Sequence, residues 1–302
     1  MRNGVGKMLN SRSSGFMWVL PVLIVELMLL GYPIIRTIYL SLFESNFASM
    51  TKSFIGFQGF VKVLLEPRFY TIIRTSLVWT VGIVVACLLM ALPLAALLNR
   101  EGFGRHPLVR LIFLIPWATP WVIIGLTWKW IYASTFGMLD VILKDLGLDF
   151  LIRTWLIDTQ TVLPAVMIPM IWRGVSFGAF MYLAALQGVP EELYEAATVD
   201  GANELHKFWH ISIPGIAPTI LAVNLLGFMW TLNSFQVIWI MTGGGPVVAT
   251  TTLPVEIYKQ AFRFYRFGEA SVYAVILMFL LSIFVWLYLR FGARFEDGGE
   301  QL

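Results

Sequence analysis

The sequence predicts an all-α integral membrane protein, and three observations lead to this fold class. Hydrophobic residues make up 58% of the 302 residues, whereas only 13% carry a charge. Soluble domains carry roughly 25% charged residues. The mean hydropathy is +0.78, and several apolar runs are long enough to cross a hydrocarbon core about 30 Å thick as helices. This composition excludes a disordered chain, a coiled coil and a disulfide-stapled secreted domain.

Apolar runs near 20 residues in length predict six transmembrane helices. They are Phe16–Leu42, Ser76–Leu98, Leu108–Tyr132, Val162–Leu186, Ile216–Met241 and Val272–Phe291. The first run is too long for the apolar region of a signal peptide, and it carries Glu26 but lacks a small-residue cleavage site. We therefore expect one six-span domain over residues 16–292, with tails at 1–15 and 293–302.

The charge distribution leaves the orientation of the spans open. Lys and Arg residues divide evenly between the two sides, although the short loop 99–107 and both tails mildly favour cytoplasmic termini. The pI is near 9.0, but the basic residues are scattered and form no stripe that could follow a nucleic-acid backbone. The single cysteine, Cys87, lies inside an apolar run and is expected to be a small buried residue.

The sequence contains no motif for catalysis or nucleotide binding. A glycine-rich loop ending in Lys-Ser or Lys-Thr is absent, so we expect no P-loop for ATP. The glycine run at 243–245 precedes Pro246, which lacks a backbone donor, and is expected to form a turn. His206 and His210 share a helix face, but no third ligand is near, so we expect a solvated or docking face rather than a metal site.

Two spans carry polar or small residues on one helical face each. In the fifth span they recur at +3, +7 and +10, as Asn224, Gly227, Thr231 and Ser234. In the fourth span they recur at +3, +4, +7 and +11, as Met170, Arg173, Gly174, Phe177 and Met181. Polar residues at membrane depth tend to face a cavity or a packed partner. The pattern leaves a cavity wall and a helix-packing face equally open.

The segment between the fourth and fifth spans, residues 187–215, predicts two short helices outside the membrane. Two glutamates in the first turn complement the dipole of the first helix. Asp200-Gly201 breaks the chain between the helices, because glycine can adopt positive φ. A second helix is expected over Ala202–Ile211. Such a helix–turn–helix is either a docking surface or a plain amphipathic connector.

This loop resembles the EAA signature of importer-type ABC permeases. The residues that carry the resemblance are Glu195, Ala196, Ala197, then Gly201, and the end Ile211-x-Ile213-Pro214. Other motifs are similar to those of carbohydrate-uptake permeases, namely Gly31-Tyr32-Pro33, Leu40-Ser41-Leu42-Phe43, Trp128-Lys129-Trp130, Asp200-Gly201-Ala202, and Thr242 to Pro246 followed by Ile257-Tyr258. The Gly-Gly-Pro element is similar to the MalF-like half of the permease pair. The chain lacks the extra N-terminal spans and the large periplasmic insertion of maltose-type MalF.

The resemblance implies a type I ABC importer permease fold, with six transmembrane helices and a cytoplasmic coupling helix. It implies a multi-pass protein of the cytoplasmic (inner) membrane of a bacterium or archaeon, with both termini cytoplasmic. The implied partners are a second, MalG-like permease, two copies of an ABC ATPase subunit, and a periplasmic or lipid-anchored solute-binding protein. The chain itself would be no enzyme and hold no cofactor, because ATP and Mg would be bound by the ATPase. The implied coupling residues are Glu195, Ala196, Ala197, Asp200 and Gly201.

Alignment on the family's landmarks implies which residues contact the substrate. These are Arg173, Gly174, Phe177, Gly227, Thr231 and Ser234. Maltose permeases have amide and hydroxyl side chains where this chain has smaller or different ones, so we do not expect maltose as the sugar. Gly174 is expected to leave room for a bulky head group. Phe228 and Trp230 could stack on a pyranose ring or face lipid.

Arg173 raises a separate question, because a guanidinium at membrane depth needs a partner. Its insertion costs about 2.5–3.5 kcal/mol. Glu26 lies in another span and Asp158 lies outside the spans, so the candidates within the chain are few. Either an oxyanion of the substrate or an acid or carbonyl of the partner permease could satisfy the guanidinium. The first possibility predicts a sulfonated, phosphorylated or carboxylated sugar.

An ion-coupled secondary transporter of a small polar solute is the main alternative. It would need acidic residues within the spans and internal repeats. Glu26 is the one such acid in the predicted spans, and we see no repeat. A membrane enzyme is a third possibility, weakened because no catalytic constellation is apparent.

Overall fold

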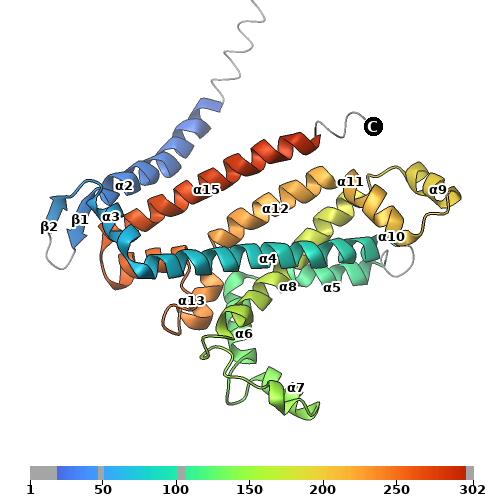
Figure 1. Ribbon diagram of the computed structural model, residues 1–302, viewed down its shortest axis with the longest axis horizontal. Helices are drawn as coiled ribbons and strands as arrows, with labels where there is room; N and C mark the ends of the chain where they lie inside the picture. The colour runs from blue at the N-terminus through green and yellow to red at the C-terminus, as the bar shows by residue number, and fades with distance from the viewer. Residues whose placement is uncertain (1–18, 47–50, 101–105, 297–302) are drawn as a thin grey trace, which may run out of the picture. The chain divides into compact units, whose positions relative to one another are not determined.

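The computed structural model describes residues 19–46, 51–100 and 106–296, and these residues are mostly helical (Figure 1). Residues 1–15 and 297–302, most of the two predicted tails, lie outside this range. Four helices are long and apolar enough to cross a membrane, and there are up to six spans if each of two bent helix pairs counts as one. The chain divides into two compact units, residues 1–65 with 257–276 and residues 66–256 with 277–302.

The first unit contains a membrane-length helix, a hairpin and a short helix. Its elements are η1 (Leu27–Gly31) and α2 (Tyr32–Ser41), which belong to one helix over Val19–Ser41, then β1 (Phe43–Asn46), β2 (Thr51–Phe54), α3 (Gln58–Leu65) and η5 (Lys259–Arg263). The antiparallel hairpin pairs Phe43 with Phe54. It is a short addition to the predicted helical fold, formed where aromatic residues such as these two favour a pleated, half-buried surface.

The helix Val19–Ser41 turns its apolar side chains outward. None of its most apolar window is buried within the chain, and Glu26 is likewise exposed. Such a surface is typical of a span that faces lipid or a neighbouring subunit.

The second unit is built around two long helices that lie side by side, α4 (Pro67–Asn99) and α8 (Val162–Leu186) (Figure 1). α8 begins and ends at the residues predicted for the fourth span. α12 (Ala217–Leu232) packs against α4, and α5 (Pro107–Ala118) packs against α8. Small residues let membrane helices approach closely. Accordingly, a Cβ added at Gly178 of α8 would lie 3.0 Å from the Cβ of Ala91 on α4.

The remaining elements of the described residues are short, except for α15 with its 30 residues. They are α6 (Trp121–Ile131), α7 (Met138–Asp145), η3 (Asp149–Leu151), α9 (Glu191–Val199), α10 (Glu204–Lys207), η4 (Phe208–Ser212), α11 (Ile213–Gly215), α13 (Gln236–Thr242), α14 (Leu253–Tyr258) and α15 (Phe267–Glu296). The residues of α14 and α15 divide between the two units. α15 takes the place of the predicted sixth span and begins five residues earlier.

The third predicted span, Leu108–Tyr132, is broken rather than continuous. α5 and α6 meet at an angle of 93°, with Thr119 and Pro120 between them. Proline lacks a backbone donor and disfavours helical backbone at the preceding residue, so the helix ends there. Hydropathy alone does not register this break, because both sides of it are apolar.

The fifth predicted span, Ile216–Met241, is also corrected. The helical segment Glu204–Gly215 meets α12 at an angle of 70°, so the extramembrane helix expected over Ala202–Ile211 begins two residues later and continues farther. α12 ends at Leu232, and α13 follows after a non-helical step at residues 233–235.

The glycine run after α13 forms the turn that the sequence predicts. Gly243 and Gly244 have φ angles of 61° and 85°, which glycine adopts without the steric cost of a side chain. Two buried threonines hold this turn, because Thr250 Oγ1 donates to Gly245 O at 2.7 Å and Thr251 Oγ1 donates to Gly244 O at 2.6 Å.

A buried ion pair follows the turn. The carboxylate of Glu256 on α14 is fully buried and lies 2.9 Å from Nη2 of Arg68 at the start of α4. Nearby along the same two helices, the Leu253 amide donates to Ser76 Oγ at 2.9 Å. Glu256 lies outside all six spans that the sequence predicts. Sequence reasoning therefore missed the most deeply buried acid of the described residues.

Candidate functional site

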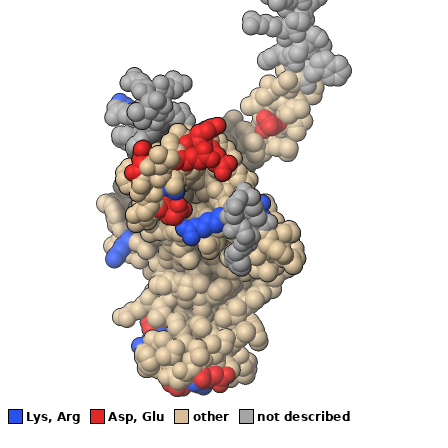
Figure 2. Space-filling model, turned by 90° about the vertical axis from the view of Figure 1, so that its right-hand side faces the viewer, with Lys and Arg blue, Asp and Glu red and all other residues tan. Residues whose placement is uncertain are grey.

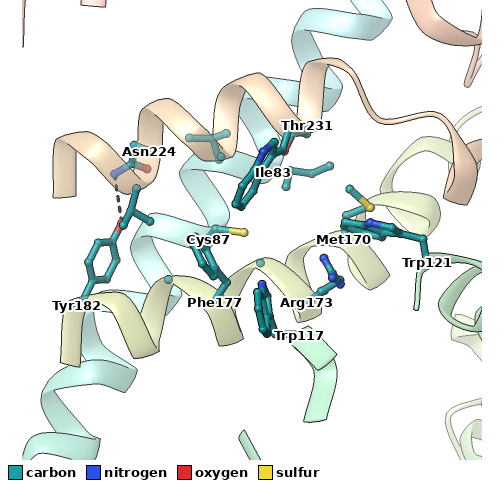
Figure 3. Close-up of a pocket in the computed structure, with 16 residues that line it drawn as sticks. Ile83, Cys87, Trp117, Trp121, Met170, Arg173, Phe177, Tyr182, Asn224 and Thr231 are labelled. Carbon is teal, nitrogen blue, oxygen red and sulfur yellow. Dashed lines mark hydrogen bonds between the residues drawn. The ribbon is translucent and has the colours of Figure 1, made fainter. Parts of the chain in front are cut away.

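A cavity that is partly open to solvent lies between α4, α8, α12 and the α5–α6 break (Figure 3). All of its lining residues belong to the second unit. Five of the six residues that the sequence proposes as substrate contacts line it, namely Arg173, Gly174, Phe177, Gly227 and Thr231. Two predicted helical faces therefore meet at one cavity.

Ser234, the sixth candidate, is not among the residues that line the cavity. α12 ends at Leu232, so the helical spacing that aligned Ser234 with Thr231 does not extend to it. Its hydroxyl instead accepts a hydrogen bond from Trp79 Nε1 at 2.9 Å and donates to Thr231 O at 2.7 Å. Met181 of the fourth-span face also lies outside the lining.

Arg173 is held between two indole rings. Its Cζ atom lies 3.7 Å from the centroid of the Trp121 ring and 6.0 Å from that of Trp117. These two residues stand on opposite sides of the helix break at Thr119 and Pro120. A cation over an indole face is stabilised by about 0.5–2 kcal/mol, which offsets part of the cost of placing this charge at membrane depth. Sequence reasoning did not identify either tryptophan.

Among the described residues, the guanidinium of Arg173 has no hydrogen-bond or ion-pair partner. Nε is buried and makes no hydrogen bond, and no Asp or Glu of the described residues forms an ion pair with the guanidinium. Asp158, one of the acids considered from the sequence, accepts from the backbone amide of Gln160 at 2.9 Å. The rings of Trp117 and Trp121 stabilise the positive charge of Arg173 through cation–π contacts, but they accept no hydrogen bond from its N–H groups.

Gly174 allows α8 to pack closely against α4, whereas the sequence suggested that it leaves room for a substrate head group. A Cβ at this position would lie 2.5 Å from Sγ of Cys87 on α4, so the space above Gly174 is filled by a neighbouring helix rather than left for a ligand. Cys87 is half-buried and lines the cavity, which corrects the expectation of a fully buried residue. Among the glycines that line the cavity, Gly227 faces open space, because a Cβ there would meet no atom within 4 Å.

Aromatic rings form one wall of the cavity. The Phe177 ring lies 5.9 Å from the Trp117 ring in a stacked arrangement and 5.4 Å from the Trp230 ring. Trp230 lines the cavity although 54% of it is exposed. Phe228 points elsewhere, since it stacks on Phe284 of α15 at 3.4 Å. The sequence left both Phe228 and Trp230 open; the structure brings only Trp230 to the cavity.

The end of the cavity away from Arg173 carries a polar pair. Asn224 Nδ2 on α12 donates to Tyr182 Oη on α8 at 3.2 Å and to Ile220 O at 2.7 Å (Figure 3). Asn224 belongs to the predicted polar face of the fifth span. Tyr182 gave no signal in the sequence, because a tyrosine in an apolar helix is usually part of the packing.

The predicted coupling loop forms the helix–turn–helix that the sequence indicates. α9 carries Glu195, Ala196 and Ala197, and it ends at Asp200 as its C-cap. Gly201 follows with φ +83°. The Gly201 amide donates to Thr198 O and the Ala202 amide donates to Ala197 O. This is the Schellman arrangement, which uses a left-handed glycine to satisfy the last carbonyl groups of a helix.

The surface of α9 is acidic and exposed. Figure 2 shows Asp and Glu side chains gathered on the side of the molecule that carries α9 and α10. They include Glu191, Glu192, Glu195 and Asp200. One hydrogen bond, between Tyr194 Oη and the buried Ser212 Oγ at 3.0 Å, ties α9 to the following helical segment.

His206 and His210 lie on the same loop, with their rings stacked at 4.0 Å. Both are exposed, and His210 Nδ1 lies 3.0 Å from His206 O. Within the described residues no group of three or more His, Cys, Asp or Glu side chains is arranged to hold a metal ion. The loop therefore presents a shaped polar ridge rather than a coordination site.

Known proteins with a similar sequence are membrane components of transport systems. Residues 88–296 match the family described as "Binding-protein-dependent transport system inner membrane component". The sulfoquinovosyl glycerol transport system permease protein of Agrobacterium fabrum is 34% identical over 93% of this chain and 91% of its own length. The trehalose/maltose transport system permease protein MalF of Thermococcus litoralis is 30% identical, over 94% and 95% of the two chains.

A solved structure has the same fold. A chain of a bacterial ABC transporter involved in the import of the acidic polysaccharide alginate superposes with a TM-score of 0.82 at 22% identity, over 96% of this chain and 98% of that one. The resemblance to carbohydrate-uptake ABC permeases is thereby confirmed, and so is the type I importer permease fold. In this family ATP hydrolysis belongs to a separate subunit. The chain is a member of the binding-protein-dependent transport system inner membrane components, the membrane-embedded permease subunits of ABC importers.

Proposed function

We propose that this chain is the translocation subunit for an anionic sugar derivative. The observation that carries the proposal is found within one cavity. A guanidinium whose donors have no partner among the described residues lies beside a wall of aromatic rings. Aromatic faces stack on apolar faces of sugar rings, and a planar guanidinium binds oxyanions bidentately. The names of two relatives support a sugar as substrate, and one of those sugars, sulfoquinovosyl glycerol, is sulfonated.

The competing explanation for Arg173 is a partner acid in the assembled transporter. It predicts that Arg173 stabilises the permease pair rather than the substrate. The position of Arg173 favours the ligand, because its guanidinium lines the cavity beside Phe177 and is already covered on its face by Trp121.

We further propose the assembly implied by the family. A second, MalG-like permease completes a heterodimer, two ATPase subunits bind ATP and Mg, and a periplasmic or lipid-anchored binding protein delivers the substrate. This chain holds no cofactor itself. Both termini and the loop at residues 187–215 then face the cytoplasm, and α9 with Gly201 fits the ATPase. The rigid Schellman end of α9 and its exposed acidic surface support this role, because a coupling element must transmit force without bending.

The test compares uptake by the complete importer in proteoliposomes. Two variants are matched, because each removes an arginine that lies over an indole: Arg173→Gln inside the cavity, and Arg290→Gln, where Arg290 lies 5.3 Å from the Trp286 ring and outside the cavity. We expect Arg173→Gln to reduce uptake of sulfonated or carboxylated sugars at least about tenfold, since a charge-assisted hydrogen bond contributes about 1.5–3 kcal/mol. Assembly and ATPase activity should persist, and Arg290→Gln should resemble the native chain.

Two results would contradict the proposal. The first is import of neutral sugars as readily as their anionic counterparts. The second is failure of Arg173→Gln to assemble with the other subunits while Arg290→Gln assembles normally. That second result would assign Arg173 to the contact between the permeases.

A further inference from the structure

We infer that Asn224 and Tyr182 form a second recognition point of the cavity, which binds a substrate hydroxyl group remote from the negative charge. The inference rests on the proposed function and extends it. It specifies an anionic sugar joined to a further hydroxylated group, either a polyol or a second sugar, instead of a free single-ring sugar.

The hydrogen bonds of Asn224 determine what this pair offers to a ligand. An amide nitrogen carries two protons, and Asn224 Nδ2 donates to Ile220 O at 2.7 Å and to Tyr182 Oη at 3.2 Å. Both donors are thus used within the protein, and they fix the orientation of the amide. No described residue donates to the carbonyl oxygen Oδ1, so it remains an acceptor at a residue that lines the cavity.

Tyr182 supplies the complementary group. Its hydroxyl accepts the hydrogen bond from Asn224 and retains its own proton for donation. An acceptor beside a donor matches a ligand hydroxyl, which donates one hydrogen bond and accepts another. The Tyr182 ring is only 1% exposed, so packing fixes the place of the phenol.

The separation between the two ends of the cavity determines the size of the substrate. Arg173 and Tyr182 are nine positions apart on α8, which corresponds to about 13 Å along the helix axis. Side chains on a helix lean toward its N-terminus, so both lean the same way and the separation is kept. Figure 3 shows Tyr182 at one end of the cavity and Arg173 toward the other, near Trp121.

A single sugar ring is too short to reach both ends. With bonds of about 1.5 Å, opposite oxygens of a pyranose lie roughly 5–6 Å apart. An anionic ring bound at Arg173 would therefore leave the Asn224–Tyr182 pair unoccupied. The stretch between the two ends is bordered by Phe177 and by the open space beside Gly227, which suits a glycosidic link and a second group.

The pair also connects α8 with α12, so the test must separate recognition from packing. The complete importer is reconstituted with ATP, and uptake is measured for two series of probes, one sulfonated and one carboxylated. Each series contains the free sugar, its glycoside with glycerol, its glycoside with a second sugar, and the neutral counterparts. The measured quantity is the ratio of glycoside uptake to free-sugar uptake.

We expect the native chain to prefer the anionic glycosides about tenfold, the effect of one or two hydrogen bonds. Tyr182→Phe and Asn224→Leu should bring this ratio toward 1. Tyr288→Phe is the matched control: it removes a phenol that donates to Leu221 O on the same helix α12 at 2.6 Å but lies outside the cavity. It should leave the ratio at its native value.

The alternative outcomes are distinguishable. If the two variants lower uptake of every probe without changing the ratio, the pair has a packing role and the inference is wrong. A native ratio near 1 also overturns it, while a preference for anionic over neutral probes leaves the proposed function intact. If the native chain prefers glycosides to free sugars but takes up neutral and anionic probes equally well, the proposed anionic substrate is wrong and the Asn224–Tyr182 inference still stands. Should an importer with active ATPase take up no probe of either series, both proposals fail.

Discussion

The guanidinium carbon of Arg173 lies 3.7 Å from the ring centroid of Trp121, the first residue of α6 after the 93° break. The break therefore determines how the charge is covered. α5 brings Trp117 to one side of the guanidinium, and the change of direction at Thr119 and Pro120 brings Trp121 over its face. An irregularity of one span thus positions the cation on another.

We predict that Trp121→Leu weakens substrate affinity without removing the charge. The cation–π contact contributes about 0.5–2 kcal/mol, so the apparent KM for uptake should rise between roughly two- and thirty-fold. Trp286→Leu removes the ring beside Arg290 and provides the control. An unchanged KM in Trp121→Leu would mean that the ring does not hold Arg173 in its binding position.

Gly174→Ala should destabilise the contact between α4 and α8. Its Cβ would lie 2.5 Å from Cys87 Sγ, and such overpacking typically costs about 1–3 kcal/mol. The thermal unfolding midpoint of the purified complex in detergent should fall. Removing the sulfur in the double variant Gly174→Ala with Cys87→Ala should restore most of it. If the second substitution gives no recovery, the close approach is not the cause.

Gly227→Ala should leave stability intact and impair transport. A Cβ at Gly227 meets no atom within 4 Å, and alanine is favoured over glycine within a helix by about 1 kcal/mol. The added methyl group narrows the cavity, so uptake should decrease, and Gly227→Val should decrease it further. The unfolding midpoint distinguishes this case from Gly174→Ala. Native uptake by Gly227→Val would place the translocation pathway elsewhere.

The Arg68–Glu256 ion pair should respond unequally to the loss of either partner. Arg68→Met removes the guanidinium that lies 2.9 Å from a fully buried carboxylate, which costs about 3 kcal/mol or more. Glu256→Gln leaves a partly exposed guanidinium that water can solvate, and it should cost less. Lys62→Met, at the exposed Lys62–Glu269 pair with a separation of 3.9 Å, should change stability by under about 1 kcal/mol. Chemical denaturation of the complex measures all three, and equal losses at Arg68 and Glu256 would contradict this ranking.

Gly201→Val should uncouple ATP hydrolysis from transport. The φ angle of +83° is unfavourable for a β-branched residue, at a cost of about 1–2 kcal/mol. No atom lies within 4 Å of a Cβ there, so the strain comes from the backbone alone and should change the direction in which the chain leaves α9. Uptake and stimulation of ATPase activity by loaded binding protein should fall while the subunits still assemble. Unaltered transport would count against the role of this loop.

Local pattern was sufficient for the regular parts of the fold. α8 has the bounds that its apolar run predicts, because no proline-induced break or polar residue shifts its ends. Gly201 was predicted at the end of α9, since only a left-handed residue satisfies that turn. The helical period correctly predicted that Gly227 and Thr231 lie on one face, and both line the cavity. The same prediction was wrong for Ser234, because Ser234 lies beyond the end of α12.

Features that depend on contacts between distant segments could not be predicted. The cavity position of Tyr182, the cover that Trp121 provides for Arg173, and the burial of Glu256 each arise where separate helices meet. Hydropathy averages over a window and hides a break such as that at Thr119 and Pro120. A single apolar sequence does not encode which helix lies opposite a given face.

The chain has one sulfhydryl, at Cys87, and the structure places it in the cavity wall next to Gly174. An electrophile small enough to enter the cavity therefore finds a single target in this subunit. Alkylation there would add bulk where α4 and α8 already touch, directly beside the proposed path of the sugar. If the sugar passes through this cavity as proposed, a covalent adduct at Cys87 would block it, and a bound substrate would shield the thiol from reaction.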